Sequence, residues 1–237
     1  MKRSKLKLLT LLTVLAGIAG CLLMKLLYTT GIDHKGLLLQ THPAFPGIWI
    51  LTALVVLLLA VSCRKVTPAA GWEAAFPRSV IGGLLCIPAA IVFAATRIHT
   101  FFGPVGTLDL ISAGAGILCC PALLYVGLCR IRGSKPNYLA FCVLCVYFAL
   151  RLVSQYRGWS SDPQLTDYAF YLLSHVCLML SGYQLAQCSA GGSCRKLPFL
   201  ALMGSYLGLI SLSVCPDPLF MGACVLWALG SLPQEEE

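Results

Sequence analysis

Residues 46–63 read PGIWILTALVVLLLAVSC, a run of eighteen residues without a charged side chain. A helix needs about 20 predominantly apolar residues to cross a hydrocarbon layer about 30 Å thick, so an uncharged run of this length is a candidate membrane span. The apolar residues are continuous and do not alternate with polar ones as they do in the strands of a membrane barrel. Because lipid offers no hydrogen-bond partners, the backbone of such a span must satisfy itself as a helix. The stretch therefore predicts a transmembrane helix.

The composition of the whole chain agrees with this interpretation. Of its 237 residues, 58% are hydrophobic and only 11% are charged, and the mean hydropathy is +0.84. A soluble domain carries about 25% charged residues to cover its surface. These values exclude a cytosolic enzyme, a nucleic-acid-binding domain and a disordered tail. The predicted fold is an all-α, polytopic transmembrane helical bundle that forms a single domain over residues 1–237, with no soluble domain.

Eight segments along the chain are long and apolar enough, or nearly so, to be spans. They cover residues 6–28, 46–63, 79–98, 106–129, 138–155, 166–187, 197–214 and 218–232. The first segment has an alternative, because Ile18-Ala19-Gly20-Cys21 after a basic start resembles a lipoprotein cleavage site. Cleavage there would lipidate Cys21 and leave seven spans, although the apolar run continues beyond Cys21, where a lipoprotein usually turns polar.

The positions of the lysines and arginines predict the orientation of the bundle. If the N-terminus is cytoplasmic and the chain crosses eight times, only five of the 17 fall on the outer side: Lys25, Lys35, Arg97, Arg151 and Arg157. Cytoplasmic loops of membrane proteins carry an excess of lysine and arginine, so both termini are predicted to be cytoplasmic. The basic inner face would attract the anionic headgroups of the bilayer, which accounts for the net charge of +8 without a nucleic-acid partner.

The sequence lacks the motifs that would indicate catalysis. It contains no His-Glu-x-x-His, no Gly-x-Ser-x-Gly and no Walker loop. Most of the 13 cysteines fall in the predicted spans, where cysteine acts as a small apolar residue. The pairs Cys142–Cys145 and Cys188–Cys194 are candidates for a redox or metal role, but the first lies in the inner half of its span and no histidine or acid joins the second. We therefore expect no enzymatic activity, no cofactor and no metal site, with an intramembrane enzyme acting on lipid as the open alternative.

Ionisable residues within membrane spans are costly and usually face the bundle interior or the interface. In this chain they gather near the predicted outer ends of the spans, and in the sixth segment Asp167, Tyr171 and His175 recur at four-residue spacing on one helix face. The candidate ligand-binding residues are Arg97, Asp109, Arg151, Arg157, Asp162, Asp167, Tyr171 and His175. We expect Asp109 to pair with Arg97 or Arg151, which lie at a similar depth.

Two interpretations of this polar cluster stay open. In the first, the residues line an outward-facing pocket that binds a solute, a lipid headgroup or a peptide. In the second, they only form salt bridges within the bundle and anchor helix ends at the membrane interface, where long basic side chains reach toward the headgroups.

Two outer loops resemble segments that recur in a group of small bacterial multi-span membrane proteins of unassigned function. Residues 156–168 read YRGWSSDPQLTDY and residues 31–38 read GIDHKGLL. The resemblance covers mainly these two loops. It implies a multi-pass protein of the bacterial cytoplasmic (inner) membrane and brings with it no activity, ligand or catalytic residue.

The leading functional hypothesis is an integral membrane protein that binds or transports a small solute through the outward-facing polar cluster. The alternative is a sensory, assembly or accessory membrane protein that contacts a cytoplasmic protein partner through its basic inner loops. The ligand, the direction of any transport and the oligomeric state do not follow from the sequence.

Overall fold

The computed structural model spans the chain and describes residues 3–32, 38–39, 41–64, 71–103, 106–159 and 165–233. These residues form nine helices: α1 (Arg3–Thr30), α2 (Ala44–Arg64), α3 (Trp72–Ala75), α4 (Val80–Phe101), α5 (Thr107–Arg132), α6 (Tyr138–Trp159), α7 (Leu165–Ser189), α8 (Leu197–Ser211) and α9 (Pro218–Gly230). The described β structure is one isolated bridge between Ile32 and Leu38. The prediction of an all-helical fold is confirmed for this part of the chain.

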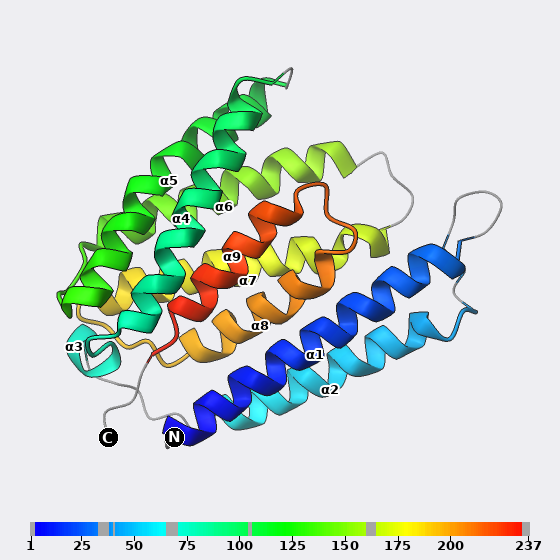
Figure 1. The fold of residues 1–237 in the computed structure, drawn as a ribbon, viewed down its shortest axis with the longest axis horizontal. Helices are drawn as coiled ribbons and strands as arrows, with labels where there is room; N and C mark the ends of the chain where they lie inside the picture. The colour runs from blue at the N-terminus through cyan, green and yellow to red at the C-terminus, as the bar shows by residue number, and fades with distance from the viewer. Residues whose placement is uncertain are drawn as a thin grey trace.

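The helices form hairpins that surround a central pair (Figure 1). The short helices α8 and α9 pack against each other, α8 also contacts α1, α2 and α7, and α9 also contacts α4 and α7. The hairpins α1–α2, α4–α5 and α6–α7 lie around them. Most side chains of α8 and α9 are therefore buried within the protein.

Six helices are long and apolar enough to cross a membrane: α1, α2, α4, α5, α6 and α7. Their outward faces carry large apolar side chains, such as Leu15, Leu22 and Leu54, which are each more than half exposed. Exposed apolar surface of this extent is stable only against lipid or another protein. The described residues thus form a helical membrane bundle. Helix α1 runs without a break through Cys21, and cleavage at that position stays untested.

The central helices are shorter than a bilayer. At a rise of about 1.5 Å per residue, the 15 residues of α8 and the 13 of α9 extend about 22 Å and about 20 Å. A hydrocarbon layer of about 30 Å is thicker than either helix. The turn that joins them, residues 212–217, therefore lies deeper in the bundle than the nearby ends of the longer helices (Figure 1). The number of complete crossings stays a prediction.

Glycine lets α9 approach α4 closely. A Cβ atom added to Gly230 would lie 2.9 Å from the carbonyl oxygen of Gly82 and 3.0 Å from Sγ of Cys86. Eight residues earlier on the same helix, Gly222 has nothing within 4 Å of the corresponding position. Small residues are common where membrane helices pack this closely, because the attraction there is mainly van der Waals contact.

One end of the bundle carries most of the basic residues, and we call it the basic end. Its exposed cations in the described part of the chain are Lys5, Lys7, Arg64, Arg78, Arg132, Lys135, Arg195 and Lys196. The beginning of α1 and the end of α9 lie at this end (Figure 1). It corresponds to the face that the sequence predicts to be cytoplasmic.

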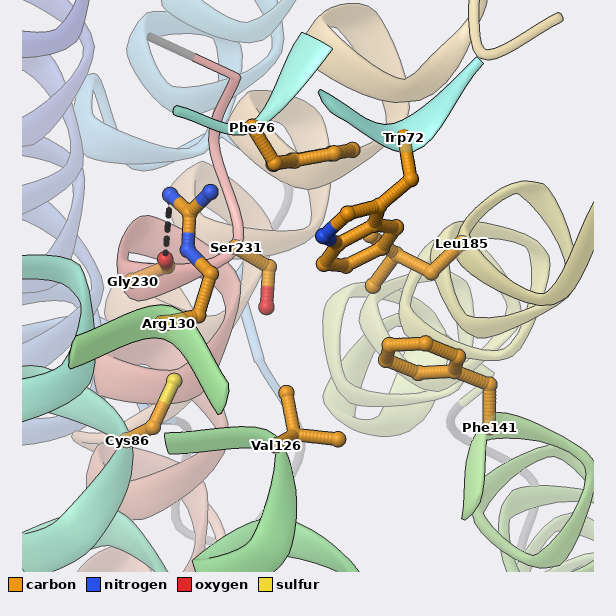
Figure 2. A pocket seen from close by; sticks show the side chains of 9 residues that line it. All are labelled: Trp72, Phe76, Cys86, Val126, Arg130, Phe141, Leu185, Gly230 and Ser231. Carbon is orange, nitrogen blue, oxygen red and sulfur yellow. Dashed lines mark hydrogen bonds between the residues drawn. The ribbon is translucent and has the colours of Figure 1, made fainter. Parts of the chain in front are cut away.

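The segment between α2 and α4 contains a feature that the sequence analysis missed. We expected only a loop there, but the short helix α3 places Trp72 and Phe76 inside the basic end, with their rings 4.3 Å apart. Trp72 also contacts Phe141, and the guanidinium of Arg130 lies 4.7 Å from the centre of the Phe76 ring (Figure 2). A single helical turn is too short for a periodic pattern, so only its buried aromatic residues could have indicated it.

Candidate functional site

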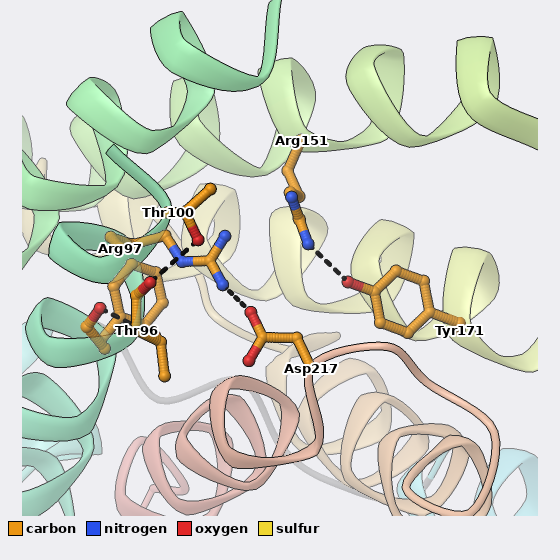
Figure 3. Close-up of polar contacts among 7 residues, drawn as sticks. Thr96, Arg97, Thr100, Arg151, Tyr171 and Asp217 are labelled. Carbon is orange, nitrogen blue, oxygen red and sulfur yellow. Dashed lines mark hydrogen bonds and ion pairs between the residues drawn. The ribbon is translucent and has the colours of Figure 1, made fainter. Parts of the chain in front are cut away.

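Two arginines lie inside the bundle near the end opposite the basic end. Arg97 on α4 is 0% exposed and Arg151 on α6 is 5% exposed. Arg97 stands four residues before the end of α4 and Arg151 eight residues before the end of α6, which at 1.5 Å per residue places them about 6 Å and about 12 Å below those helix ends. Both side chains point toward the beginning of α9 (Figure 3).

Asp217 holds the first of these arginines. Its carboxylate forms an ion pair with the guanidinium of Arg97, and the Phe220 ring lies 4.3 Å from the guanidinium carbon. Asp217 occupies the N-cap position of α9, yet its side chain caps no backbone amide of that helix. The carboxylate therefore pairs with Arg97 and does not cap its own helix. Gly116 on α5 provides the space, because a Cβ there would lie 2.5 Å from Cγ of Arg97.

Arg151 has polar and aromatic neighbours but no carboxylate. Its Nη2 lies 3.5 Å from the hydroxyl oxygen of Tyr171 (Figure 3). When the Gln155 amide is oriented with its oxygen toward Arg151, that oxygen accepts from both terminal nitrogens at 3.0 Å. The Phe220 ring centre is 5.8 Å away. Among the described acidic residues none forms an ion pair with Arg151, so the cluster carries two cations and one anion.

His175 and Tyr147 complete the cluster with buried polar atoms. The Nδ1 atom of His175 lies 2.9 Å from the carbonyl oxygen of Tyr171, one turn earlier on α7, which fixes the proton on this nitrogen. The other ring nitrogen, Nε2, and the hydroxyl of Tyr147 have no hydrogen-bond partner, although both residues are 0% exposed. The Tyr147 ring packs edge-on against Phe220, with 5.9 Å between ring centres.

Asp109 does not have the partner that we expected. Its carboxylate accepts a hydrogen bond from Ser154 on α6, and Arg97 pairs with Asp217 instead. The expectation of an Asp109 pair with Arg97 or Arg151 was wrong. It assumed that all connections between helices lie at the membrane surface, whereas the short α8 and α9 bring Asp217 down to the depth of Arg97.

The structure brings together four of the eight predicted site residues: Arg97, Arg151, Tyr171 and His175. Asp109, in the first turn of α5, lies beside the group through its contact with Ser154, three residues after Arg151 on α6. Arg157 is exposed near the end of α6. Asp162 and the side chain of Asp167 lie outside the described residues.

The sequence analysis missed Asp217, Phe220, Tyr147 and Gln155 as members of the cluster. Asp217 stands between Pro216 and Pro218, a sequence typical of a turn, and an aspartate in a turn gives no indication of a partner on a distant helix. The remaining three residues have ordinary positions in apolar helices. No spacing rule distinguishes them from packing residues.

The cysteines do not join this cluster as a reactive group. All thirteen are free thiols, and the described residues contain no group of three or more His, Cys, Asp or Glu side chains suited to a metal ion. At the basic end, a hydrogen bond with the Cys188 thiol lowers the pKa of Cys194, which lies in the loop after α7. These two cysteines are therefore in contact, as their positions on either side of a short glycine-rich loop allow.

Comparisons of this chain with protein-family models, with curated proteins and with solved structures gave no match. The fold and the site by themselves define the class. The chain is a helical membrane protein whose central hairpin inserts an aspartate between buried arginines.

Proposed function

We propose that the protein binds a small organic anion at the cluster of Arg97, Arg151, Tyr147, His175 and Phe220, and moves it across the membrane. One observation carries the proposal: two arginines are buried among the helices with a single carboxylate between them. A charged residue within a membrane span costs about 2.5–3.5 kcal/mol on insertion scales, and such residues usually mark functional sites. A bound anion would neutralise the second arginine.

The chemistry of the cluster suits a carboxylate. The planar guanidinium of arginine presents paired N–H groups that match the two oxygens of a carboxylate. Asp217 already supplies such a group to Arg97 from within the chain. The unpartnered Tyr147 hydroxyl and His175 Nε2 are further hydrogen-bonding atoms for the ligand. The rings of Phe220, Tyr147 and Phe148 exclude water around them.

The short central hairpin of α8 and α9 suggests how the protein moves a bound anion across the membrane. In many secondary transporters, short or interrupted helices place their N-termini toward anionic groups near the middle of the membrane. The N-terminus of α9, with its partial positive charge, begins directly after Asp217. We propose that an anion competes with Asp217 for Arg97 and that release of Asp217 allows the hairpin to shift.

We place this activity in the cytoplasmic membrane of a bacterium, with eight crossings and both termini cytoplasmic. The location follows from the resemblance of the loops at 31–38 and 156–168, and the orientation from the gathering of cations at the basic end. Both are parts of the proposal.

The test compares anions with their neutral isosteres. Thermal unfolding of the purified protein in detergent is followed with sodium acetate against acetamide and with sodium lactate against lactamide, at constant ionic strength. We expect at least one anion to raise the unfolding temperature while its amide does not. Arg151→Gln should abolish the rise, because it removes the cation that lacks a carboxylate.

Arg157→Gln is the matched control, since it removes an exposed cation from the same helix. It should respond to the anions as the natural protein does. A rise that is equal for acids and amides, or one that persists in Arg151→Gln, would contradict anion binding at this cluster. Arg151→Lys, which keeps the charge, should retain part of the response if the variant protein is folded.

A further inference from the structure

A crevice opens at the basic end, far from the cluster around Arg97. Its volume is about 630 Å³, within the range of about 300–1,000 Å³ that is usual for ligand sites. It lies between the first turns of α1 and the beginning of α4, and the end of α9 closes it. Its apolar walls include Leu6, Val14, Ile81, Leu85 and Leu229.

Three cations line this apolar crevice: Lys7, Arg78 and Arg130. Nε of Arg78 donates to the carbonyl oxygen of Ile131 at 3.0 Å, which holds the side chain at the crevice while its terminal nitrogens stay available. In the part of the chain that the structure describes, no acidic residue forms an ion pair with any of the three. An apolar crevice with a net positive charge matches the chemistry of an anionic amphiphile.

The burial of Arg130 is a second, independent observation that points to an anion in the crevice. It is only 3% exposed, and its Nη2 donates to the carbonyl oxygen of Leu232 at 3.0 Å. Its Nε and Nη1 have no hydrogen-bond partner among the residues that the structure describes. Figure 2 shows this guanidinium beside Gly230 at the end of α9. A buried arginine with unused donors is costly without an anion nearby.

The dimensions of the crevice fit one leaflet of a bilayer. The eight-residue distance from Leu6 to Val14 corresponds to about 12 Å along α1 at 1.5 Å per residue. Half of a hydrocarbon layer of about 30 Å is about 15 Å. The crevice faces the lipid, since the side chains of Leu11 and Ile81 on its rims are 56% and 70% exposed. A lipid can therefore enter it sideways from the membrane.

We infer that this crevice is a binding site for one anionic phospholipid of the surrounding bilayer. The phosphate lies against Lys7 and Arg78 with Arg130 behind them, and one acyl chain lies between α1 and α4. The three cations select an anionic headgroup over a zwitterionic one, because the described part of the crevice offers no carboxylate for a choline or an amine. This site is independent of the proposed anion site at the opposite end.

Native mass spectrometry of the protein released from detergent, after incubation with phosphatidylglycerol or with phosphatidylcholine of the same chains, tests the inference. The natural protein should retain one phosphatidylglycerol and little phosphatidylcholine. The double variant Lys7→Gln/Arg78→Gln should lower retention at least fivefold, roughly the factor expected for one basic residue at an anionic lipid surface. Glycerol 1-phosphate, which has the headgroup phosphate but no acyl chains, should not compete.

Two matched controls separate a built site from general attraction to a basic surface. Arg132→Gln/Lys135→Gln removes the same charge from exposed positions at the same end and should retain the lipid. Leu11→Trp/Ile81→Trp keeps every charge but fills the crevice, and should lose the lipid. Leu22→Trp/Leu118→Trp adds the same bulk on lipid-facing positions away from the crevice, and should retain it.

Three results would overturn the inference: equal retention of both lipids, equal losses in the two charge variants, or full retention in the filled variant. The three glutamates 235–237 follow the crevice residue Pro233 in the sequence. If only Glu235→Gln/Glu236→Gln/Glu237→Gln retains phosphatidylglycerol, the acidic tail is the occupant and the lipid is not. Retention in the natural protein excludes that occupant.

Discussion

A guanidinium inside a membrane bundle loses most of its hydration and must find its partners within the protein. Arg97 finds a carboxylate in Asp217 and an aromatic face in Phe220, while Gly116 leaves room for its aliphatic stem. These partners come from two helices, α9 and α5, while Arg97 itself belongs to α4. The pair therefore fixes the central hairpin relative to α4 and α5. Removing either partner should lower the free energy of unfolding of the whole bundle.

Asp217→Asn is expected to lower the free energy of unfolding by about 3 kcal/mol, since removing one partner of a buried pair leaves the other charge uncompensated. The value is at the low end of the known range because the Asp217 side chain is 24% exposed. Thermal or denaturant unfolding of the purified protein in detergent measures the change.

Asp109→Asn provides the comparison for this prediction. An asparagine can still accept the hydrogen bond from Ser154, and no arginine depends on Asp109 in the described structure. We expect its cost to be below about 1 kcal/mol, as for the net worth of one hydrogen bond. Equal losses in the two variants would show that Arg97 does not depend on Asp217 in particular.

At the scale of helices, the sequence predicted the apolar segments well because lipid imposes a simple rule of length and hydropathy. Each of the eight predicted segments overlaps one long or central helix of the described structure, and the short helix α3 is the addition. The partners of the arginines did not follow from that rule. They depend on the depth of the 212–217 turn, which is set by how short α8 and α9 are and by what surrounds them.

The sequence predicted half of the candidate site for a similar reason. Arg97, Arg151 and His175 stand out because charged or titratable groups are rare in an apolar helix. Phe220 and Tyr147 do not stand out, since aromatic residues occur throughout these spans and their role depends on tertiary contact. A rule applied to one helix at a time cannot predict a cluster whose residues come from four helices.

Packing of the central hairpin gives a prediction with an internal control on one helix. Gly230→Ala places a methyl group 2.9 Å from the carbonyl oxygen of Gly82, a backbone atom that cannot move aside easily. We expect a loss of about 1–3 kcal/mol in the free energy of unfolding, as for other overpacked positions. Thermal unfolding in detergent is again the measurement.

Gly222→Ala should not lower the free energy of unfolding as Gly230→Ala does. The added methyl group meets nothing within 4 Å, and alanine is favoured over glycine in a helix interior by about 1 kcal/mol. The variant is expected to be as stable as the natural protein or slightly more stable. If both alanine variants behave alike, close packing between α9 and α4 does not limit the stability of the bundle.

At the scale of the whole molecule, the proposed orientation in the membrane follows from the charge of the basic end. The eight exposed cations of this end are separated by the length of the helices from Arg97 and Arg151, which are buried near the other end. Lysine and arginine in short loops are retained in the cytoplasm during insertion. The proposed lipid site at the basic end and the proposed anion site near the opposite end then belong to opposite sides of the membrane.

Reporter fusions test this orientation. An enzyme that is active only outside the cytoplasm should give no signal when fused after Glu237 or inserted in the loop 133–137, because this loop and the end of α9, which precedes Glu237 in the sequence, belong to the basic end. The same enzyme inserted within residues 33–37, which follow α1, should be active. The expectation holds whether α8 and α9 cross fully or enter only part of the way, since a hairpin returns to the side on which it began. Strong activity after Glu237 would require an odd number of crossings and would overturn the proposed orientation.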